Sequence, residues 1–283
     1  MSNNIDYVPY MQIAKNISIN KGDVLYIVSD VLEIAKNCRD NDEVFDCEEF
    51  IVSLQRAVGD TGTLLFSTFN WDFCNGTAFD YHKTRGKTGK LGNVALQMPG
   101  FKRTQHPLYS FAVWGHYSEL LSNMTNITSF GEDSPFGFMY NNAHMLIFGN
   151  PHGRGYTFIH YVEQKYGVDF RYEKEFTADY TDKDENVESR TYSMYVRDLD
   201  INPQLKDYQF KELDEWMSSD GIIDRTFINN IPYDKIKLEQ MYEYIKDDLL
   251  NNKSQRIYIF GSEEPLEDAN NTRKLTCLRN SKI

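Results

Sequence analysis

The sequence predicts an α/β fold, and three features support this class. Short runs of β-branched and aromatic residues, typical of strands, recur between segments with helical spacing. The first two runs flank an amphipathic helix, as in a β-α-β unit. Hydrophobic residues make up 41% of the 283 residues and aromatic residues 14%, which is enough apolar material for a sizeable core.

The β-α-β start is the clearest part of this pattern. Strands are expected at Val24 to Val28 and at Thr63 to Phe66, because both are short apolar runs. The helix between them ends at Gly59, and its apolar face consists of Cys47, Phe50, Ile51, Leu54 and Val58. The two strands are therefore expected to lie in one sheet with the helix packed on it.

Later segments continue the alternation of strands and helices. Further strands are expected at Tyr109 to Trp114, Met145 to Phe148, Phe170 to Phe176 and Thr191 to Arg197. The charged stretch Asp182 to Glu188 reads as a solvated turn between the last two. Helices are expected around Asp207 to Met217 and after Pro232, the latter with its apolar stripe at Leu238, Met241, Ile245 and Leu249. We expect one domain over residues 1–262 and a loose tail over residues 263–283.

The charge balance restricts the partners. Lys and Arg total 30 and Asp and Glu total 42, so the formal net charge is −12. Such a chain repels polyanions on average, which argues against a nucleic-acid partner, whereas a cationic small substrate is compatible with it.

Targeting signals and cysteine spacing point to a cytoplasmic protein. The first sixteen residues lack the basic and apolar regions of a signal peptide, and no apolar run approaches the ~20 residues of a membrane span. The four cysteines are too sparse for a disulfide framework and form no CxxC pair, so reduced thiols are expected.

A basic loop lies in the first half of the chain. Thr84 to Leu91 superficially resembles a phosphate-binding P-loop, but Thr84 replaces the first glycine and Leu91 replaces the hydroxyl residue that would hold magnesium. A P-loop is therefore rejected. A flexible basic loop that contacts a phosphate remains open, because four cations gather there: Lys83, Arg85, Lys87 and Lys90.

Two histidines stand in segments that carry chemistry. His106 precedes Pro107, which forces it toward extended geometry at the entry of an apolar strand. It is either a catalytic or ligand-contacting side chain or a strand cap that bonds to the backbone.

The second histidine lies in the segment from Thr157 to Glu163. With Thr157 as the helix N-cap and Gly167 as the C-cap, His160 and Glu163 lie three residues apart on one face. His160 then sits in the first turn, where the helix dipole keeps the imidazole neutral, as a general base requires. The alternatives are a solvated His/Glu pair or two ligands of a metal, although no third ligand with local spacing is evident.

Five segments in chain order resemble the aminoglycoside 3-N-acetyltransferase family. They are Thr63 to Trp71, Phe79 to Asp80, Gly100 to Pro107 with Ser110, Ser134 to Gly137, and Thr157 to Glu163. The resemblance extends over about Gly22 to Arg197. It implies a three-layer α/β/α sandwich of the family's type, with the late helices packed on the main sheet, and acetyl transfer from acetyl-CoA to an amine of an amino sugar, without a metal.

The resemblance also implies roles for particular residues. His160 becomes the catalytic base, with Glu163 beside it. The family's Arg-Ser/Thr-x-His-Pro segment lines the coenzyme and active-site region, which assigns coenzyme contacts to Arg103, Thr104 and Ser110. In the same segment, His106 is expected to stabilise the reacting oxygen or to protonate the departing thiolate. The basic loop adds Lys83 and Arg85 as contacts for coenzyme phosphates.

One turn departs from the family's pattern. Related sequences commonly show a His-x-Ser turn after the first strand, where this chain has Val28-Ser29-Asp30. Ser29 is retained as a coenzyme contact, and an acidic Asp30 beside a pyrophosphate is unfavourable unless it points away.

The departure, together with Asn70 to Asp72, suggests an acceptor from surface-glycan synthesis, either a free or a nucleotide-linked amino sugar. Its contacts are expected at Trp71, Asp72 and Asp80. The alternatives are resistance to aminoglycosides, a catalytically impaired binding homologue, and a metal-dependent hydrolase using His160 and Glu163.

Overall fold

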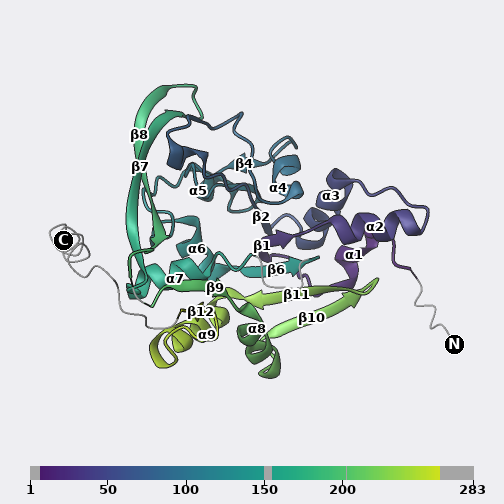
Figure 1. Ribbon diagram of the computed structural model, residues 1–283. Helices are drawn as coiled ribbons and strands as arrows, with labels where there is room; N and C mark the ends of the chain where they lie inside the picture. The colour runs from purple at the N-terminus through teal and green to yellow at the C-terminus, as the bar shows by residue number, and fades with distance from the viewer. Residues whose placement is uncertain (1–6, 150–154, 202, 262–283) are drawn as a thin grey trace.

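The computed structural model describes residues 7–149, 155–201 and 203–261. A seven-stranded sheet forms its centre, in the order β10-β11-β6-β1-β2-β5-β4 (Figure 1). The strands are β1 (Val24–Ser29), β2 (Thr63–Ser67), β4 (Lys102–Arg103), β5 (Phe111–Gly115), β6 (His144–Phe148), β10 (Ile223–Ile228) and β11 (Ile231–Lys237). The expected tail lies outside the described residues, and a single domain over residues 1–262 stays a prediction.

The middle of the sheet is parallel and its two sides are antiparallel. Strand β1 pairs in parallel with both β2 and β6, which confirms the β-α-β start. On either side, β5 and β11 run antiparallel to their inner neighbours. The carboxyl ends of the three parallel strands therefore meet at one edge, which is where ligands bind in open α/β sheets.

Helices cover both faces of this sheet, as the three-layer prediction requires. On one face lie α1 (Tyr10–Asn16), α2 (Leu32–Asp40), α3 (Cys47–Val58) and α4 (Lys90–Ala95). The other face carries α6 (Pro135–Asn142), α7 (Ile159–Tyr166), α8 (Phe210–Ser219) and α9 (Leu238–Asn251). Alternation along β1 explains the two layers, because Leu25 and Ile27 join the first core while Val24 and Tyr26 join the second. The late helices thus pack where they were expected.

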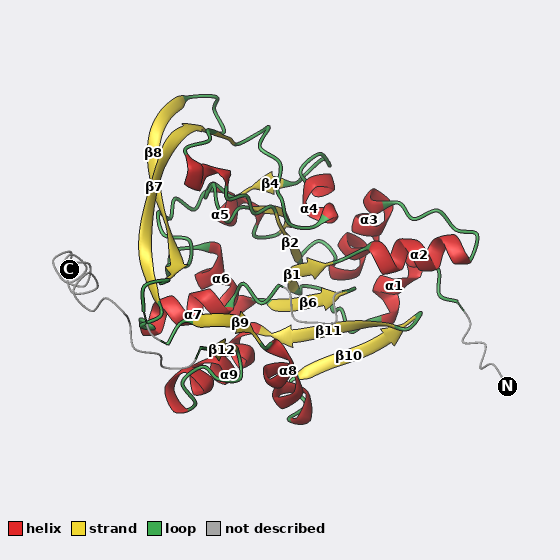
Figure 2. Ribbon diagram, in the orientation of Figure 1, coloured by secondary structure: helices red, strands yellow, loops and turns green. Residues whose placement is uncertain are grey.

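Two smaller sheets extend the second layer. A long hairpin of β7 (Arg171–Thr181) and β8 (Val187–Arg197) carries the short β3 (Phe79–Asp80) along β7. In Figure 2 this hairpin curves up one side of the molecule, opposite α1, α2 and α3. Strands β9 (Leu205–Tyr208) and β12 (Tyr258–Phe260) pair antiparallel near α9. A short α5 (Ser118–Ser122) and a 3-10 turn η1 (Asp72–Asn75) complete the described elements.

The structure corrects several expected boundaries. Helix α8 begins at Phe210 rather than near Asp207, because residues 205–208 pair as β9 instead. Pro232 lies inside β11 rather than before the last helix. It is tolerated there because β6 pairs with β11 only from Tyr233 onward, so the missing N–H of Pro232 is not needed on that side. Helix α2 was not expected from the sequence.

Candidate active site

Helix α7 presents a histidine and a glutamate to each other. Nδ1 of His160 lies 2.5 Å from Oε2 of Glu163, three residues later on the same helix. Gly167 ends the helix in the left-handed conformation (φ 63°), as expected. Thr157 is not the N-cap; the cap is Phe158, with no side-chain bond. Backbone carbonyls of Tyr156 and Thr157 close the first turn instead.

The pair is buried, which removes the interpretation as a solvated helix face. Glu163 is fully buried, and the His160 side chain is 17% exposed. Burial lowers the pKa of His160 below its ordinary value, and the positive charge of Arg171 adds to this, against the opposing effect of Glu163. The neutral imidazole expected from the helix dipole is therefore present, but burial is the main cause.

Three residues around Glu163 were not found from the sequence. Arg171, the first residue of β7, places Nε 2.9 Å from Oε2 of Glu163, and Tyr258 of β12 donates its hydroxyl to Oε1. Arg171 also donates to the hydroxyls of Tyr208 and Tyr258. Burial would raise the pKa of Glu163, but the interaction with His160, the charge of Arg171 and the hydrogen bonds to the carboxylate hold it below the ordinary value. No local motif marks these residues, because each comes from a different strand.

His106 is buried and bonded through both ring nitrogens. Nδ1 accepts from the backbone N–H groups of Leu108 and Tyr109, and Nε2 lies 3.2 Å from the carbonyl oxygen of Ile127. Burial lowers its pKa to about 4, so the ring is neutral and Nε2–H donates to Ile127. This geometry supports the strand-capping interpretation rather than a part in proton transfer.

The residues expected to touch the coenzyme from this segment lie in the interior. Arg103 donates to Ser110 and to the carbonyl oxygens of Tyr81 and Thr84, and its guanidinium lies over the ring of Phe79. These bonds tie β4 to the start of the basic loop.

Thr104 and Ser110 are equally enclosed. Thr104 Oγ1 accepts from the N–H of Phe111, and Ser110 bonds to the hydroxyl and carbonyl of Thr68. Both side chains are 1% exposed or less. The side chains of Arg103, Thr104 and Ser110 therefore lie behind the site rather than lining it.

The basic loop is fixed rather than flexible. Asn93 bonds to both backbone groups of Gly86, and Asn70 donates to the carbonyl oxygen of Arg85. The loop also approaches the end of β2 closely, since a Cβ on Gly86 would lie 2.7 Å from Cα of Thr68. Its opposite side passes the end of β1, where a Cβ on Gly89 would lie 3.8 Å from the carbonyl oxygen of Ser29. Ser29 and the basic loop, both expected at the coenzyme, are therefore neighbours.

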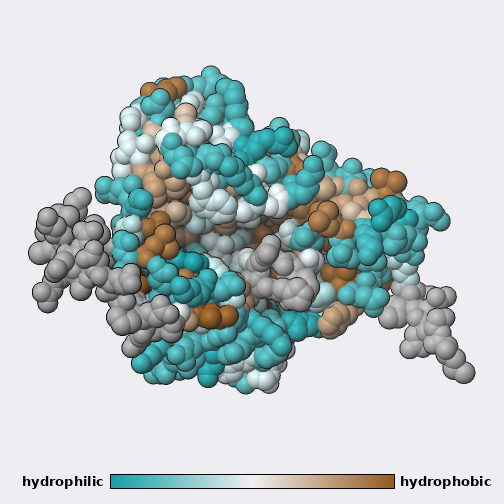
Figure 3. Space-filling model, in the orientation of Figure 1, coloured by the Kyte–Doolittle hydropathy of each residue, from teal (hydrophilic) through white to brown (hydrophobic). Residues whose placement is uncertain are grey.

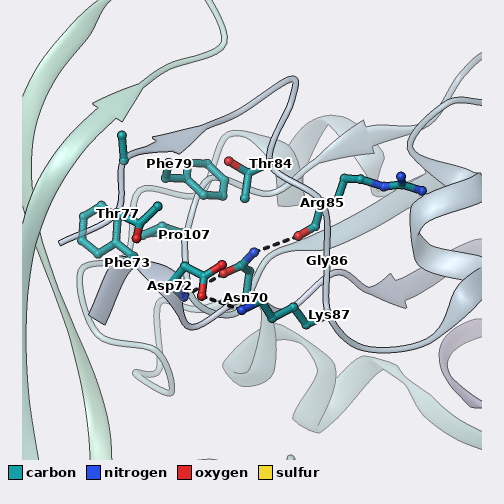
Figure 4. A pocket seen from close by; sticks show the side chains of 11 residues that line it. Asn70, Asp72, Phe73, Thr77, Phe79, Thr84, Arg85, Gly86, Lys87 and Pro107 are labelled. Carbon is teal, nitrogen blue, oxygen red and sulfur yellow. Dashed lines mark hydrogen bonds and ion pairs between the residues drawn. The ribbon is translucent and has the colours of Figure 1, made fainter. Parts of the chain in front are cut away.

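A pocket of about 360 Å³ opens beside this loop (Figure 4). Its wall includes Asn70, Asp72, Thr84 and Lys87, and aromatic rings of Phe73 and Phe79 close one side. Lys87 pairs with Asp72 at 2.5 Å. In Figure 4 the guanidinium of Arg85 extends away from the aromatic wall, so this charge and the pocket lie on different sides of the loop.

The other expected acceptor contacts are divided by the structure. Trp71 is 36% exposed, and its ring lies 6.1 Å from that of Tyr109. The ring of Tyr109 contacts that of Phe130, which in turn contacts the imidazole of His160. A row of rings therefore runs from Trp71 to His160. Asp80 does not line the pocket; its carboxylate accepts from the backbone of the following turn and pairs with Lys83, which holds its pKa below the ordinary value despite partial burial.

The acidic residue of the altered turn is bonded locally. The carboxylate of Asp30 accepts from the N–H of Leu32, the first residue of α2. The altered turn thus holds this acidic group against the start of the following helix.

The described residues contain no group of three His, Cys, Asp or Glu side chains placed to hold a metal ion. Within the same residues, no helix is long and apolar enough to cross a membrane. Figure 3 shows a mainly hydrophilic face, with hydrophobic residues visible in a hollow between the hairpin β7–β8 and helices α1 to α3.

Comparisons with known proteins identify the fold and the family of this chain. No curated protein matches the chain. Among solved structures, AAC-IIIb in a binary complex with CoASH has a TM-score of 0.72 at 16% identity, covering 92% of this chain and 100% of that one. Aminoglycoside acetyltransferase AAC(3)-Xa has a TM-score of 0.70 at 18% identity, covering 86% and 93%.

A third structure, AAC-VIa bound to sisomicin, has a TM-score of 0.67 at 15% identity and covers 87% of this chain and 98% of that one. These likenesses establish the fold. The family model described as aminoglycoside 3-N-acetyltransferase matches residues 38–249, which include the pair of His160 and Glu163, the basic loop and the His-Pro segment. The chain therefore belongs to the aminoglycoside 3-N-acetyltransferase family.

Proposed function

We propose that the protein transfers an acetyl group from acetyl-CoA to a primary amine of an amino sugar, with His160 as the general base. The observation that carries this proposal is the buried pair of His160 and Glu163 in a chain of this family. Nδ1 is engaged with Glu163, which leaves Nε2 to take a proton from the acceptor. A cytoplasmic location, expected from the sequence, would supply the acetyl-CoA.

The chemistry follows from the neutral ring. The acceptor amine attacks the thioester carbonyl, the new C–N bond forms and the C–S bond breaks. Nε2 of His160 takes the proton that the amine loses, and the departing thiolate takes up a proton to become the coenzyme thiol. A positioned base of this kind contributes about 10²–10⁴-fold.

The coenzyme is proposed to bind at the carboxyl edge, alongside Ser29 and the basic loop. Support comes from the close approach of Gly89 to Ser29 and from the exposed cations Lys83 and Arg85 beside it. Phosphate groups are favoured where such cations gather. Arg103 would act indirectly, by holding the loop.

The acceptor is proposed to lie along Trp71 toward His160, with one sugar ring in the pocket beside Asp72. At about 360 Å³ this pocket is near the small end of ligand sites, which run from about 300 to 1,000 Å³. Lys87 already neutralises Asp72, and Lys83 neutralises Asp80. This pairing favours an amino sugar with few ammonium groups, such as a nucleotide-linked sugar of surface-glycan synthesis.

An aminoglycoside acceptor is the second candidate, because AAC-VIa has been solved bound to sisomicin. The test measures thiol release from acetyl-CoA with nucleotide-linked amino sugars, free amino sugars and aminoglycosides at one ionic strength. A higher kcat/KM for a sugar supports the glycan proposal, and efficient acetylation of the drugs alone overturns it.

The base is tested by His160→Ala. We expect turnover to fall about 10²–10⁴-fold while the Kd for coenzyme A changes little, since the role is confined to the transition state. Tyr242→Phe is the control. Wild-type turnover in His160→Ala refutes the assignment. Coenzyme binding by the wild-type protein without turnover of any amine indicates an impaired homologue, and stoichiometric zinc indicates a metal-dependent hydrolase.

A further inference from the structure

We propose that Arg171 and Tyr258 are positioning residues for the catalytic pair, and that together they hold the Glu163 carboxylate ionised and in the orientation that accepts from His160. The inference rests on the proposed role of His160 as the base. It extends that role to two residues that touch neither the histidine's free nitrogen nor the pocket.

The carboxylate of Glu163 is bonded on both oxygens. Oε2 accepts from Nδ1 of His160 at 2.5 Å and forms an ion pair with Nε of Arg171 at 2.9 Å, and Oε1 accepts from the hydroxyl of Tyr258. The side chains of Glu163 and Arg171 are 0% and 5% exposed. A carboxylate so deeply buried stays charged only when it is paired and hydrogen-bonded. Without both partners it would either take up a proton or rotate away from His160.

The two partners come from separate strands of the chain. Gly167 reverses the chain after α7, so that Arg171 begins β7 directly behind the helix. Tyr258 returns after α9, where its strand pairs with β9 opposite Tyr208. The buried carboxylate of Asp248 on α9 accepts from the N–H of Arg256, which fixes the turn before β12. Tyr258 lies beyond the residues that the family model matches.

Burial has the largest effect on the pKa of His160, and the charges around the pair modify it. Glu163 on the same helix favours its protonation, while Arg171 from β7 and Arg197 from β8 oppose it. Glu163 is faced in addition by the hydroxyls of Tyr195 from β8 and Tyr258 from β12. Arg171 therefore has two effects: it keeps Glu163 ionised as the acceptor for His160 and keeps His160 itself neutral.

The test compares pH profiles of kcat/KM for the full-length enzyme with one acceptor. The acidic limb of the kcat/KM profile reports the pKa of the base in the free enzyme. Arg171→Gln removes an opposing positive charge, so this limb should move to higher pH by about one pH unit. Glu163→Gln removes the favouring negative charge and should move it to lower pH. Arg171→Lys retains the charge and should leave the limb near its wild-type position.

A second pair of variants tests the hydroxyl and does not depend on the folding of the charge variants. Tyr258→Phe should lower kcat about tenfold with little change in KM, because the carboxylate loses one charge-assisted bond and its orientation. Tyr242→Phe is the matched control. It removes another buried hydroxyl, bonded to Tyr166 at the far end of α7, and should keep wild-type kcat and the wild-type limb.

The outcomes separate this inference from the proposed function. If His160→Ala abolishes turnover but Tyr258→Phe behaves like Tyr242→Phe, and the limb of Arg171→Gln does not move, the positioning role is wrong and the base stands. If His160→Ala retains turnover, the proposed base itself is wrong. Opposite limb shifts for Arg171→Gln and Glu163→Gln support the positioning role, because a general loss of packing would not reverse sign between them.

Discussion

Replacement of Glu163 by glutamine should destabilise the fold strongly as well as impair catalysis. The substitution keeps the shape of the side chain, removes its charge and replaces one acceptor oxygen by an NH2 donor. Arg171 is then left at 5% exposure without its carboxylate partner. Such an unpaired buried charge lowers the free energy of unfolding strongly, because the desolvation of the guanidinium is no longer offset by its attraction to a carboxylate.

The expected magnitude follows from the depth of the pair. Removing one partner of a buried ion pair typically costs about 3–5 kcal/mol. For a chain of this size that corresponds to a fall in Tm of roughly 5–8 °C. The amide oxygen of glutamine can still accept from His160, and its NH2 group can donate to the hydroxyl oxygen of Tyr258, so the effect should come from the charge rather than from lost packing.

Urea unfolding at pH 7 measures the effect. Glu119→Gln is a matched control, since Glu119 pairs with Lys102 at the surface with 71% of its side chain exposed, and its loss should leave stability close to wild type. The double variant Glu163→Gln/Arg171→Gln removes both buried charges and should recover much of the loss. A double-mutant cycle then gives the coupling between the two residues.

The pH dependence has a definite sign. The pKa of Glu163 is lower in the folded protein than its ordinary value of 4.5, so the stabilisation is present above that value and is lost as pH falls through the folded pKa. The difference in the free energy of unfolding between wild type and Glu163→Gln should therefore become smaller only at acidic pH. A variant within about 1 kcal/mol of wild type at pH 7, with no coupling to Arg171, would refute the reasoning.

Three further predictions concern other parts of the molecule. Because the pKa of His106 is about 4 against an ordinary 6.5, the unfolded chain binds the extra proton first, and stability should fall by about 3 kcal/mol between pH 7 and 4. Urea unfolding across this range should show a weaker slope in His106→Gln, and an unchanged slope would contradict the assignment. Gly92→Ala should destabilise by about 1–3 kcal/mol, since its Cβ would lie 2.2 Å from the carbonyl oxygen of Ser67; Lys90→Ala on the same helix is the comparison, and equal melting temperatures would count against this close contact. Coenzyme A at about 100 times its Kd should stabilise the protein by about 2.7 kcal/mol in thermal unfolding, and Arg85→Ala should require more ligand for the same shift; identical titrations would exclude Arg85 from the site.

Local patterns in the sequence determined the elements whose stabilising contacts lie close along the chain. The helix from Cys47 to Val58 ends at Gly59 as its apolar spacing indicates, and β1 and β2 occupy the expected apolar runs. The meeting of His160 and Glu163 follows from three-residue spacing on any helix. Each of these outcomes depends on backbone geometry that a few neighbouring residues establish.

Only the tertiary structure decided the roles of most polar residues. Arg103 and His106 stand in motifs that suggest ligand contact, yet packing encloses both. Nη1 of Arg103 donates to the carbonyl oxygens of Tyr81 and Thr84, and Nε2 of His106 donates to that of Ile127. Tyr258 lies 95 positions from Glu163 in the sequence and contacts it because β12, which follows α9 in the chain, pairs with β9. Burial and charge at a side chain depend on every segment packed around it, so they cannot be read from the residues beside it in the sequence.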